Sequence, residues 1–172
     1  MRIDTERLVL VPLGLEHLES THAYAADPET TKYMMFLPVD SLEETRKYIA
    51  DCVAERQKPV PGYYEFAVLL DGVHIGGVSL YFDTAPDIGE LGWIIARAYQ
   101  GHGYAAEAAR ALIDWGREAL NVRRFIAHCD ADNLASQAVM RRLGMTLTDA
   151  SGVRKNRGSD ESRREYLYEL TI

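Results

Sequence analysis

The stretch Gln100-Gly101-His102-Gly103-Tyr104-Ala105 joins an apolar run, Leu91–Ile95, to a long alanine-rich segment. The run predicts a strand and the alanine-rich segment a helix, so a glycine-bearing loop opens this helix. Glycines let backbone N–H groups approach a ligand closely, and a helix N-terminus attracts anions. The pattern therefore predicts an anion site, with phosphate as the expected anion. The same glycines would also suit a plain strand-to-helix turn.

The whole chain has the size and composition of one globular domain, 1–172. Its 172 residues are 47% hydrophobic and 26% charged, which excludes a largely disordered protein. The sequence has neither an apolar run of bilayer length nor a signal-type N-terminus, so we expect a cytoplasmic protein without a membrane partner. A net charge of −7 argues against nucleic acid as the main partner. Cys52 and Cys129 lack metal or redox spacing, so we expect buried thiols and no metal.

Hydrophobic periodicity predicts a mixed, mostly antiparallel α/β (α+β) fold, with about seven strands and about four helices. Ser41-Leu42-Glu43-Glu44 is typical of a capping box, and Asp71-Gly72 of a two-residue hairpin turn. The polar stretch Ser151–Arg164 is interpreted as a mobile loop. The expected strands are 7–12, 65–70, 73–82, 88–95, 124–129, 145–150 and 165–171, and the expected helices are 16–26, 42–53, 104–120 and 133–143.

Two further local features bear on the shape of the sheet. Gly89 and Gly92 lie inside the expected strand 88–95, which suggests a bulge or a close backbone approach by a ligand. A turn over residues 85–87 should lead into that strand. Asn121 is a plausible left-handed terminator of the helix 104–120.

The loop, the strand before it and Asn133-Leu134-Ala135-Ser136 together resemble the GNAT superfamily of N-acetyltransferases, most closely its RimJ/RimL-like branch. The family's loop pattern is Gln/Arg-x-x-Gly-x-Gly/Ala, which residues 100–105 match at every fixed position. Other stretches that resemble this branch are Thr5-Glu6-Arg7-Leu8, Asp27-Pro28-Glu29 and Leu143-Gly144-Met145.

The resemblance implies that acetyl-CoA, as cosubstrate, lies along a splayed strand in the sheet. Its pyrophosphate would rest on the backbone amides of residues 101–105, and its pantetheine arm would pair with the backbone near Ile94. An amide there would also steady the oxyanion at the thioester carbonyl. Asn133 would cap a helix, contact the cofactor arm, or do both. The implied cofactor-binding residues are Trp93, Ile94, Ile95, Gln100, Gly101, His102, Gly103, Tyr104, Ala105 and Asn133.

Acetyl transfer to an amine needs a base, and a proton donor for the leaving thiolate. Glu90 lies four residues before Ile94 on the same strand, where the family often places its base; the alternative is a solvated carboxylate. The family's usual tyrosine acid falls on Met140, which cannot donate a proton. Ser136, one turn earlier on the same helix face, is the candidate donor, or else it helps to cap the helix.

Other polar and aromatic residues receive plainer interpretations. His102 is expected to contribute its backbone N–H, and His74 and His128 to be structural. Four tyrosines either line an acceptor pocket or belong to the core: Tyr33, Tyr63, Tyr64 and Tyr81. Three carboxylates that would attract a cationic amine are interpreted as solvated charges: Glu65, Asp83 and Asp87.

Two rival functions remain open from the residues. Gly101-x-Gly103-x-x-Ala106 also fits a dinucleotide-binding fingerprint, with Asp130 as a ribose ligand. Five residues separate this loop from its strand, however, and antiparallel hairpins precede it, which disfavours that fold. The second rival is a non-catalytic acyl-CoA-binding module. The acceptor amine is not identified and includes protein N-termini, amino acids, polyamines and aminoglycosides. The resemblance also makes a homodimer plausible.

Overall fold

The computed structural model describes residues 1–85 and 87–172, with the backbone alone for residues 83–85. Its centre is one sheet of eight strands in the order β1-β2-β3-β4-β5-β6-β8-β7. Neighbouring strands are antiparallel, except that β5 and β6 run parallel. The strands are β1 (Ile3–Asp4), β2 (Leu8–Pro12), β3 (Tyr63–Leu70), β4 (Val73–Ala85), β5 (Ile88–Ile95), β6 (Arg124–Asp130), β7 (Thr146–Lys155) and β8 (Ser162–Thr171).

The predicted mixed sheet is confirmed, with one strand more than expected. The extra strand is β1, whose two residues pair with Leu10 and Val9 of β2. The expected turn at 85–87 includes residue 86, which lies outside the described residues. The irregular pairing of this region lies in β4, between Tyr81 and Ala85. Gly92 pairs with Ser79 in regular register, so the bulge suggested at Gly92 is absent from the described pairing.

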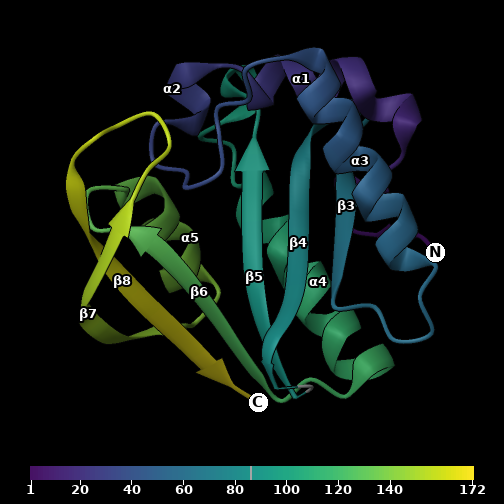
Figure 1. Ribbon diagram of the computed structural model, residues 1–172. Coiled ribbons are helices and arrows are strands. Elements are labelled where there is room, and N and C mark those ends of the chain that lie inside the picture. The colour runs from purple at the N-terminus through teal and green to yellow at the C-terminus, as the bar shows by residue number, and fades with distance from the viewer. Residues whose placement is uncertain (86) are drawn as a thin grey trace.

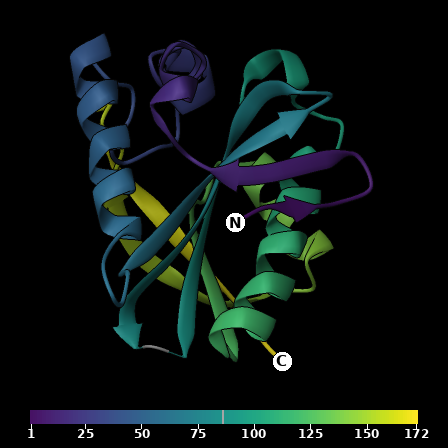
Figure 2. The ribbon, with the colours of Figure 1, turned by 90° about the vertical axis from the view of Figure 1, so that its right-hand side faces the viewer.

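Helices cover both faces of the sheet, with α4 on one face and α3 on the other (Figure 2). The helices are η1 (Leu15–His17), α1 (Leu18–Ala25), α2 (Pro28–Thr31), α3 (Leu42–Arg56), η2 (Arg97–Tyr99), α4 (Tyr104–Leu120) and α5 (Leu134–Arg142). The short helix α2 was not expected, because the predicted helix ended at residue 26. Pro28 is favourable at the first helical position, and the Asp27 carboxylate accepts from Thr30 N at 3.1 Å. Within the described residues, no helix is both long and apolar enough to span a bilayer.

Local capping and turn signals appear close to where the sequence predicts them. Ser41 Oγ accepts from Glu44 N at 3.2 Å, as in the predicted capping box. The Glu44 carboxylate differs, because it accepts from Asp40 N at 2.9 Å rather than from Ser41 N. Asp71 and Gly72 take φ values of 49° and 80°, as a tight hairpin turn requires. These local features agree with the prediction because each depends on residues only a few positions apart in the chain.

The core consists of two apolar layers, one on each face of the sheet. The α4 layer is tightly packed: Ala108 and Leu112 are fully buried, and a Cβ on Gly116 would lie 3.1 Å from Leu80 Cδ2. A smaller layer under α1 and α3 contains Leu13, Leu18, Ile49, Cys52 and Ala67. Close packing on both faces restrains β3, β4 and β5, so the side chains along these strands are held in defined positions.

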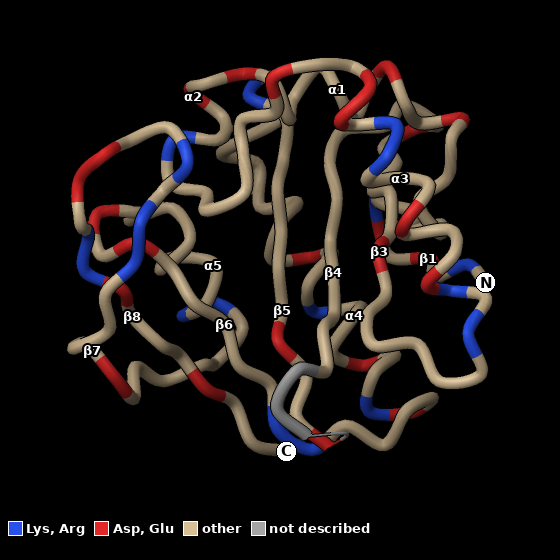
Figure 3. Tube along the Cα trace, in the orientation of Figure 1, with Lys and Arg blue, Asp and Glu red and all other residues tan. Residues whose placement is uncertain are grey.

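The predicted mobile loop at 151–164 is wrong, because most of it forms a hairpin. β7 continues to Lys155 and β8 starts at Ser162, with Arg154 pairing with Arg163. Charged residues of both signs line this hairpin (Figure 3). They find partners far away in the sequence: Arg163 Nε donates to Asp130 at 2.8 Å, and Arg154 Nη2 donates to Tyr33 O at 3.0 Å. These long-range contacts, invisible in a local pattern, order the segment.

Candidate functional site

The sheet opens between its two parallel strands. β5 and β6 pair at only three positions, the last being Glu90 with Ile126. Beyond that point they diverge, leaving a V-shaped gap between the two ribbons (Figure 1). The backbone of Leu91–Ile95 thus has no strand partner on the β6 side among the described pairings. A strand edge without a partner offers N–H and C=O groups to an extended ligand. The predicted splay is confirmed.

The loop that follows β5 has the conformation that its glycines suggest. Gly101 and Gly103 take φ values of 81° and 85°, in the left-handed region that favours glycine. Gln100 Nε2 donates to Ile95 O at 2.8 Å, which ties the loop to the end of β5. His102 Nδ1 donates to Gln100 O at 2.9 Å, so its imidazole braces the loop. This agrees with a backbone role for His102, although this role itself stays a prediction.

The loop ends at the N-terminus of α4, where backbone donors are exposed. The first intrahelical bond runs from Glu107 N to Gly103 O at 3.1 Å. The amides of Tyr104, Ala105 and Ala106 precede that bond and have no carbonyl of their own helix to pair with. Together with the helix dipole, they form an environment that favours an anion.

Two arginines from distant segments lie beside the same loop. A Cβ on Gly103 would be 3.3 Å from Arg142 Nη1 and 3.7 Å from Arg7 Nη2. Arg7 is held in place, since it pairs with Glu107 at 2.6 Å and donates to His102 O at 3.1 Å. Sequence reasoning missed both as neighbours of the loop, because Arg7, just before β2, and Arg142, at the end of α5, are far from it in the chain and carry no local signal for this proximity. Arg142 adds positive charge beside the N-terminus of α4, whereas the charge of Arg7 is balanced by Glu107.

The predicted base, Glu90, has a side-chain partner in His128, which we expected to be structural. His128 Nδ1 donates to Glu90 Oε1 at 2.8 Å. This hydrogen bond raises the pKa of His128, against the lowering effect of its partial burial. Both side chains line the cavity described below. The parallel register of β5 and β6 makes this contact, and residues 90 and 128 are too far apart in the chain for a local pattern to show it.

On the other wall of the gap, α5 starts with the predicted cap. Asn133 Oδ1 accepts from Ser136 N at 3.1 Å, so Asn133 caps the helix. Both residues line the cavity. Met140, four residues after Ser136 on the same helix, is fully buried in the core. Ser136 is therefore a hydroxyl at the cavity wall, and Met140 is a packing residue.

One large cavity of about 1040 Å³ joins the gap, the loop and the face of the sheet under α3. Its walls include every predicted site residue except His102: Glu90, Trp93, Ile94, Ile95, Gln100, Gly101, Gly103, Tyr104, Ala105, Asn133 and Ser136. Tyr33 and Tyr81 also line it, whereas Tyr64 packs against the core. The structure thus brings the separate sequence motifs together on the wall of one cavity.

Glu65 is not the solvated charge that we expected. It lines the cavity, and the Tyr81 hydroxyl donates to its carboxylate. Burial raises the pKa of Glu65 to about 7, although hydrogen bonding from Tyr81 and Tyr48 counteracts part of this rise. The sequence places Glu65 on a strand, but the tyrosines around it come from β4 and α3. The side chain of Asp83, a second carboxylate in that expectation, lies outside the described residues.

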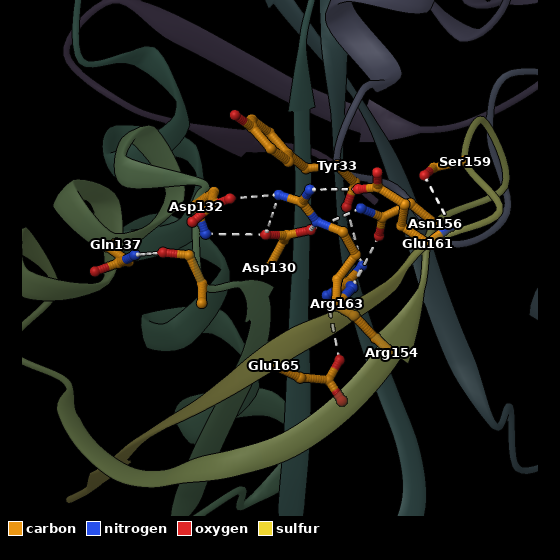
Figure 4. A network of polar contacts seen from close by, with 11 residues as sticks. Tyr33, Asp130, Asp132, Gln137, Arg154, Asn156, Ser159, Glu161, Arg163 and Glu165 are labelled. Atoms are coloured by element: carbon orange, nitrogen blue, oxygen red, sulfur yellow. Dashed lines mark hydrogen bonds and ion pairs between the residues drawn. The ribbon is translucent and has the colours of Figure 1, made fainter.

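The environment of Asp130 argues against the dinucleotide-binding alternative, in which this carboxylate would bind a ribose. Its carboxylate accepts from Arg163 Nε at 2.8 Å and from Asn156 Nδ2 at 2.7 Å (Figure 4). Burial alone would raise the pKa of Asp130, but the contacts with Arg163 and Asn156 hold it below its usual range. With its side chain 1% exposed, Asp130 is a structural ion-pair partner for the β7–β8 hairpin and has no free face for a ribose.

Neither cysteine has the environment of a nucleophile. Both are buried and unpaired with each other, as predicted. Burial raises the pKa of Cys52 to about 12 and that of Cys129 to about 11. Thiols with such pKa values are protonated at neutral pH and react slowly.

Comparison with known proteins agrees with this geometry. A model of the acetyltransferase (GNAT) domain matches residues 7–146. The uncharacterised N-acetyltransferase YnaD of Bacillus subtilis is 28% identical over 148 residues, 84% of this chain and 82% of that protein. A GNAT-family acetyltransferase from Bacillus anthracis, 27% identical, superposes with a TM-score of 0.86 over 99% of this chain and 98% of its own.

The chain therefore belongs to the acetyltransferase (GNAT) family, and it is an N-acetyltransferase. The RimJ/RimL-like likeness is confirmed at the level of the fold. RimL, a ribosomal-protein α-N-acetyltransferase solved in complex with coenzyme A, superposes with a TM-score of 0.88 at 22% identity. That superposition covers 100% of this chain and 98% of RimL.

Proposed function

We propose that this domain transfers the acetyl group of acetyl-CoA to a primary amine by direct attack within a ternary complex. One observation carries the proposal. The unpaired edge of β5, the glycine loop and the N-terminus of α4 follow one another along the wall of a single cavity. Such an arrangement suits a long ligand with a phosphate at one end and amides along its arm.

The loop residues fit the phosphate end of acetyl-CoA. Gly103 leaves open the space in which a Cβ would approach Arg142. In that space the amides of residues 101–105 would hold the pyrophosphate, with Arg142 and Arg7 nearby. Charge-assisted hydrogen bonds of this kind are shorter and stronger than neutral ones. RimL, crystallised with coenzyme A, shows that the same fold accepts this class of ligand.

The edge of β5 would hold the arm of the cosubstrate. The backbone of Trp93, Ile94 and Ile95 borders the gap and would pair with the amides of the pantetheine arm. Asn133, on the opposite wall, would reach the arm with its amide group while its carbonyl oxygen caps α5. Acetyl-CoA supplies an activated acyl group with a good leaving group, so the protein needs only to place it and manage protons.

The proton steps fall to residues on the two walls of the gap. Glu90 would accept the proton of the attacking amine, directly or through a water, and His128 would orient the Glu90 carboxylate. The N–H of Ile94 would donate to the acetyl carbonyl oxygen as negative charge develops there. Ser136 would give a proton to the departing sulfur. The high pKa values of Cys52 and Cys129 support direct attack by the amine over a covalent acetyl-enzyme.

The first test is ligand-induced stabilisation. A ligand at 100 times its dissociation constant adds about 2.7 kcal/mol to the free energy of unfolding. We expect acetyl-CoA to raise the melting temperature and NADH to leave it unchanged. Stabilisation by NADH alone would show that the loop binds a dinucleotide and would contradict the proposed binding of acetyl-CoA. A screen of amines for release of free thiol from acetyl-CoA then identifies acceptors.

The second test separates catalysis from binding. Glu90→Gln removes the proposed base while keeping its shape, and loss of a general base costs about 100- to 10,000-fold in rate. We expect kcat to fall by at least 100-fold while the affinity for acetyl-CoA stays within about twofold. Glu29→Gln, an exposed carboxylate on the wall of the same cavity, is the matched control. Unchanged turnover in Glu90→Gln would show that Glu90 is not the base. A protein that binds acetyl-CoA and acetylates no amine would be a non-catalytic acyl-CoA-binding module.

The acceptor class, the cytoplasmic location and a homodimeric state stay predictions of the sequence.

A further inference from the structure

A second carboxylate shares the face of the sheet on which Glu90 lies. Glu65 on β3 pairs with Ser79 on β4, and Ser79 pairs with Gly92 on β5. Because facing residues of neighbouring strands point to the same side, the side chains of Glu65 and Ser79 project toward the cavity. Strands lie about 4.8 Å apart, so β3 and β5 are separated by about 10 Å across the sheet. Only a serine and a glycine stand between Glu65 and the gap.

Tyrosines surround this carboxylate. The Tyr81 hydroxyl donates to Glu65 Oε1. Tyr48 on α3 lines the same cavity, and its hydroxyl lowers the pKa of Glu65, against the effect of burial. Tyr63 stacks on Tyr81, with ring centroids 5.1 Å apart and an angle of 25° between the rings. Aromatic faces attract organic cations. A carboxylate beside two tyrosines of the cavity wall, Tyr48 and Tyr81, is therefore suited to an alkylammonium group.

Among the side chains that the structure describes, Glu65 forms no ion pair with a lysine, arginine or histidine. Its carboxyl responds to burial and to two tyrosine hydroxyls, and none of these is a cation. Two cationic side chains of the cavity wall are already paired: Arg154 contacts Glu165 at 3.2 Å, and Arg157 contacts Asp40 at 2.7 Å. A partly buried carboxylate that carries its charge without a cation nearby is destabilising. A cation that enters the cavity would remove this cost.

We propose that Glu65, with Tyr48 and Tyr81, binds a second cationic group of the acceptor, so that the preferred acceptors are amines with two positive charges joined by an apolar spacer. This inference rests on the proposed acetyl transfer. The reacting amine would lie at the gap beside Glu90, because the edge of β5 is there. The second ammonium would lie about two strands away, on Glu65. Ser79 and Gly92, the residues that the spacer would cross, are both small and line the same cavity.

The test measures binding rather than turnover. The protein is saturated with coenzyme A, and α,ω-diaminoalkanes are titrated calorimetrically at pH 8.5 against monoamines of equal chain length, such as 1,6-diaminohexane against hexylamine. We expect at least one diamine to bind about 10-fold more tightly than its monoamine, well beyond the statistical factor of about two for its two ends. Glu65→Gln should reduce this preference to about the statistical factor. Glu29→Gln, which removes the same charge elsewhere on the cavity wall, should keep it.

Two outcomes would overturn the inference: equal binding of diamines and monoamines by the unaltered protein, or an unchanged preference in Glu65→Gln. If Glu65→Gln fails to bind coenzyme A, the unaltered protein is compared at pH 5.5 and 8.5. Protonation of Glu65 at the lower pH should abolish the preference, and a preference that persists contradicts the proposal. Failure of the acetyl transfer is a different result, because then no amine of either kind releases thiol from acetyl-CoA.

Discussion

His128 Nδ1 lies 2.8 Å from Glu90 Oε1. Glu90 is the last paired residue of β5, and His128 lies two residues beyond Ile126, its partner on β6. The pair bridges the two strands where they begin to separate. A hydrogen bond at this point can hold the Glu90 carboxylate in one orientation at the opening of the gap. It also links the protonation of His128 to the stability of the sheet at the site.

The contact between these two residues should be visible in the pH dependence of stability. The hydrogen bond to Glu90 raises the pKa of His128 above its ordinary 6.5. The folded state then binds more protons than the unfolded state, so this contribution is complete below about pH 6.5 and is lost as pH rises through the folded pKa. We expect His128→Gln to lower the free energy of unfolding more at pH 5.5 than at pH 9. The difference should be about 1 kcal/mol or less, because both side chains are partly exposed.

His74 provides a control of opposite sign. Burial, together with the nearby His17, lowers the pKa of His74 to about 4. Its folded state binds fewer protons, so stability falls as pH drops from about 6.5 toward 4. The loss of stability in His74→Gln should therefore be smaller at pH 5.5 than at pH 9. Urea unfolding at both pH values measures each variant, and a pH-independent effect of His128→Gln would contradict the coupling to Glu90.

The charged form of Glu65 should lower the stability of the unaltered protein relative to a variant with a neutral side chain at this position. Its pKa of about 7 exceeds the unfolded value of about 4.3, so the folded state binds more protons between these values. Stability should fall by at most roughly 4 kcal/mol as pH rises through this window, and it should level off above about pH 7. Glu65→Gln should be more stable than the unaltered protein at pH 8 and similar to it at pH 4. Urea unfolding at the two pH values tests this, and equal stability at pH 8 would show that burial costs the carboxylate little.

The sequence predicts those parts of the site that depend on neighbouring residues. Gly101 and Gly103 lie in one loop, Asn133 and Ser136 in one helical turn, and Asp71 and Gly72 in one hairpin. In each case the chemistry that identifies the element acts over a few positions, so the pattern and the structure agree. The splay of the sheet came from the family resemblance rather than from these patterns.

The features that the sequence could not predict are contacts between distant strands. Glu65 looks like an ordinary strand carboxylate until Tyr81 and Tyr48 are placed beside it. His128 looks structural until the register of β5 and β6 sets it against Glu90. The segment 151–164 is polar enough for a loop, and only the partners of Arg154 and Arg163 on other elements explain its order.

The loop glycines can be tested against a glycine elsewhere with the same backbone conformation. Gly103 and Gly144 have φ values of 85° and 80°, so alanine at either position should cost about 1–2 kcal/mol in strain. Only Gly103 lies in the proposed phosphate cradle, where a new Cβ would be 3.3 Å from Arg142 Nη1. We expect Gly103→Ala to weaken acetyl-CoA binding by about 10-fold or more, and Gly144→Ala to leave it unchanged. Calorimetric titration compares the two, and equal affinities would remove Gly103 from the cosubstrate site.

The ion pair below the β7–β8 hairpin should be a major source of stability for that hairpin. Arg163 holds Asp130 through two contacts, at 2.8 Å and 3.2 Å, and the Asp130 side chain is only 1% exposed. Arg163→Met would leave a buried carboxylate with the amide of Asn156 but without a cation, which typically costs about 3–5 kcal/mol. Arg163 also contacts Asp132 at 2.6 Å, but that carboxylate is 72% exposed. Asp132→Asn should therefore cost less than about 1 kcal/mol.

Urea unfolding of Arg163→Met, of Asp130→Asn and of the variant that combines them completes the test, with Asp132→Asn as the exposed control. If the loss in Arg163→Met comes from the unpaired charge, removing that charge should restore part of the stability, giving a coupling energy of about 1–3 kcal/mol. A double variant as unstable as the sum of its parts would mean that Arg163 stabilises the hairpin by packing instead. Because Arg154 of the same hairpin lines the cavity, loosening the hairpin should also weaken acceptor binding, whereas the loop that precedes α4 should keep its affinity for acetyl-CoA.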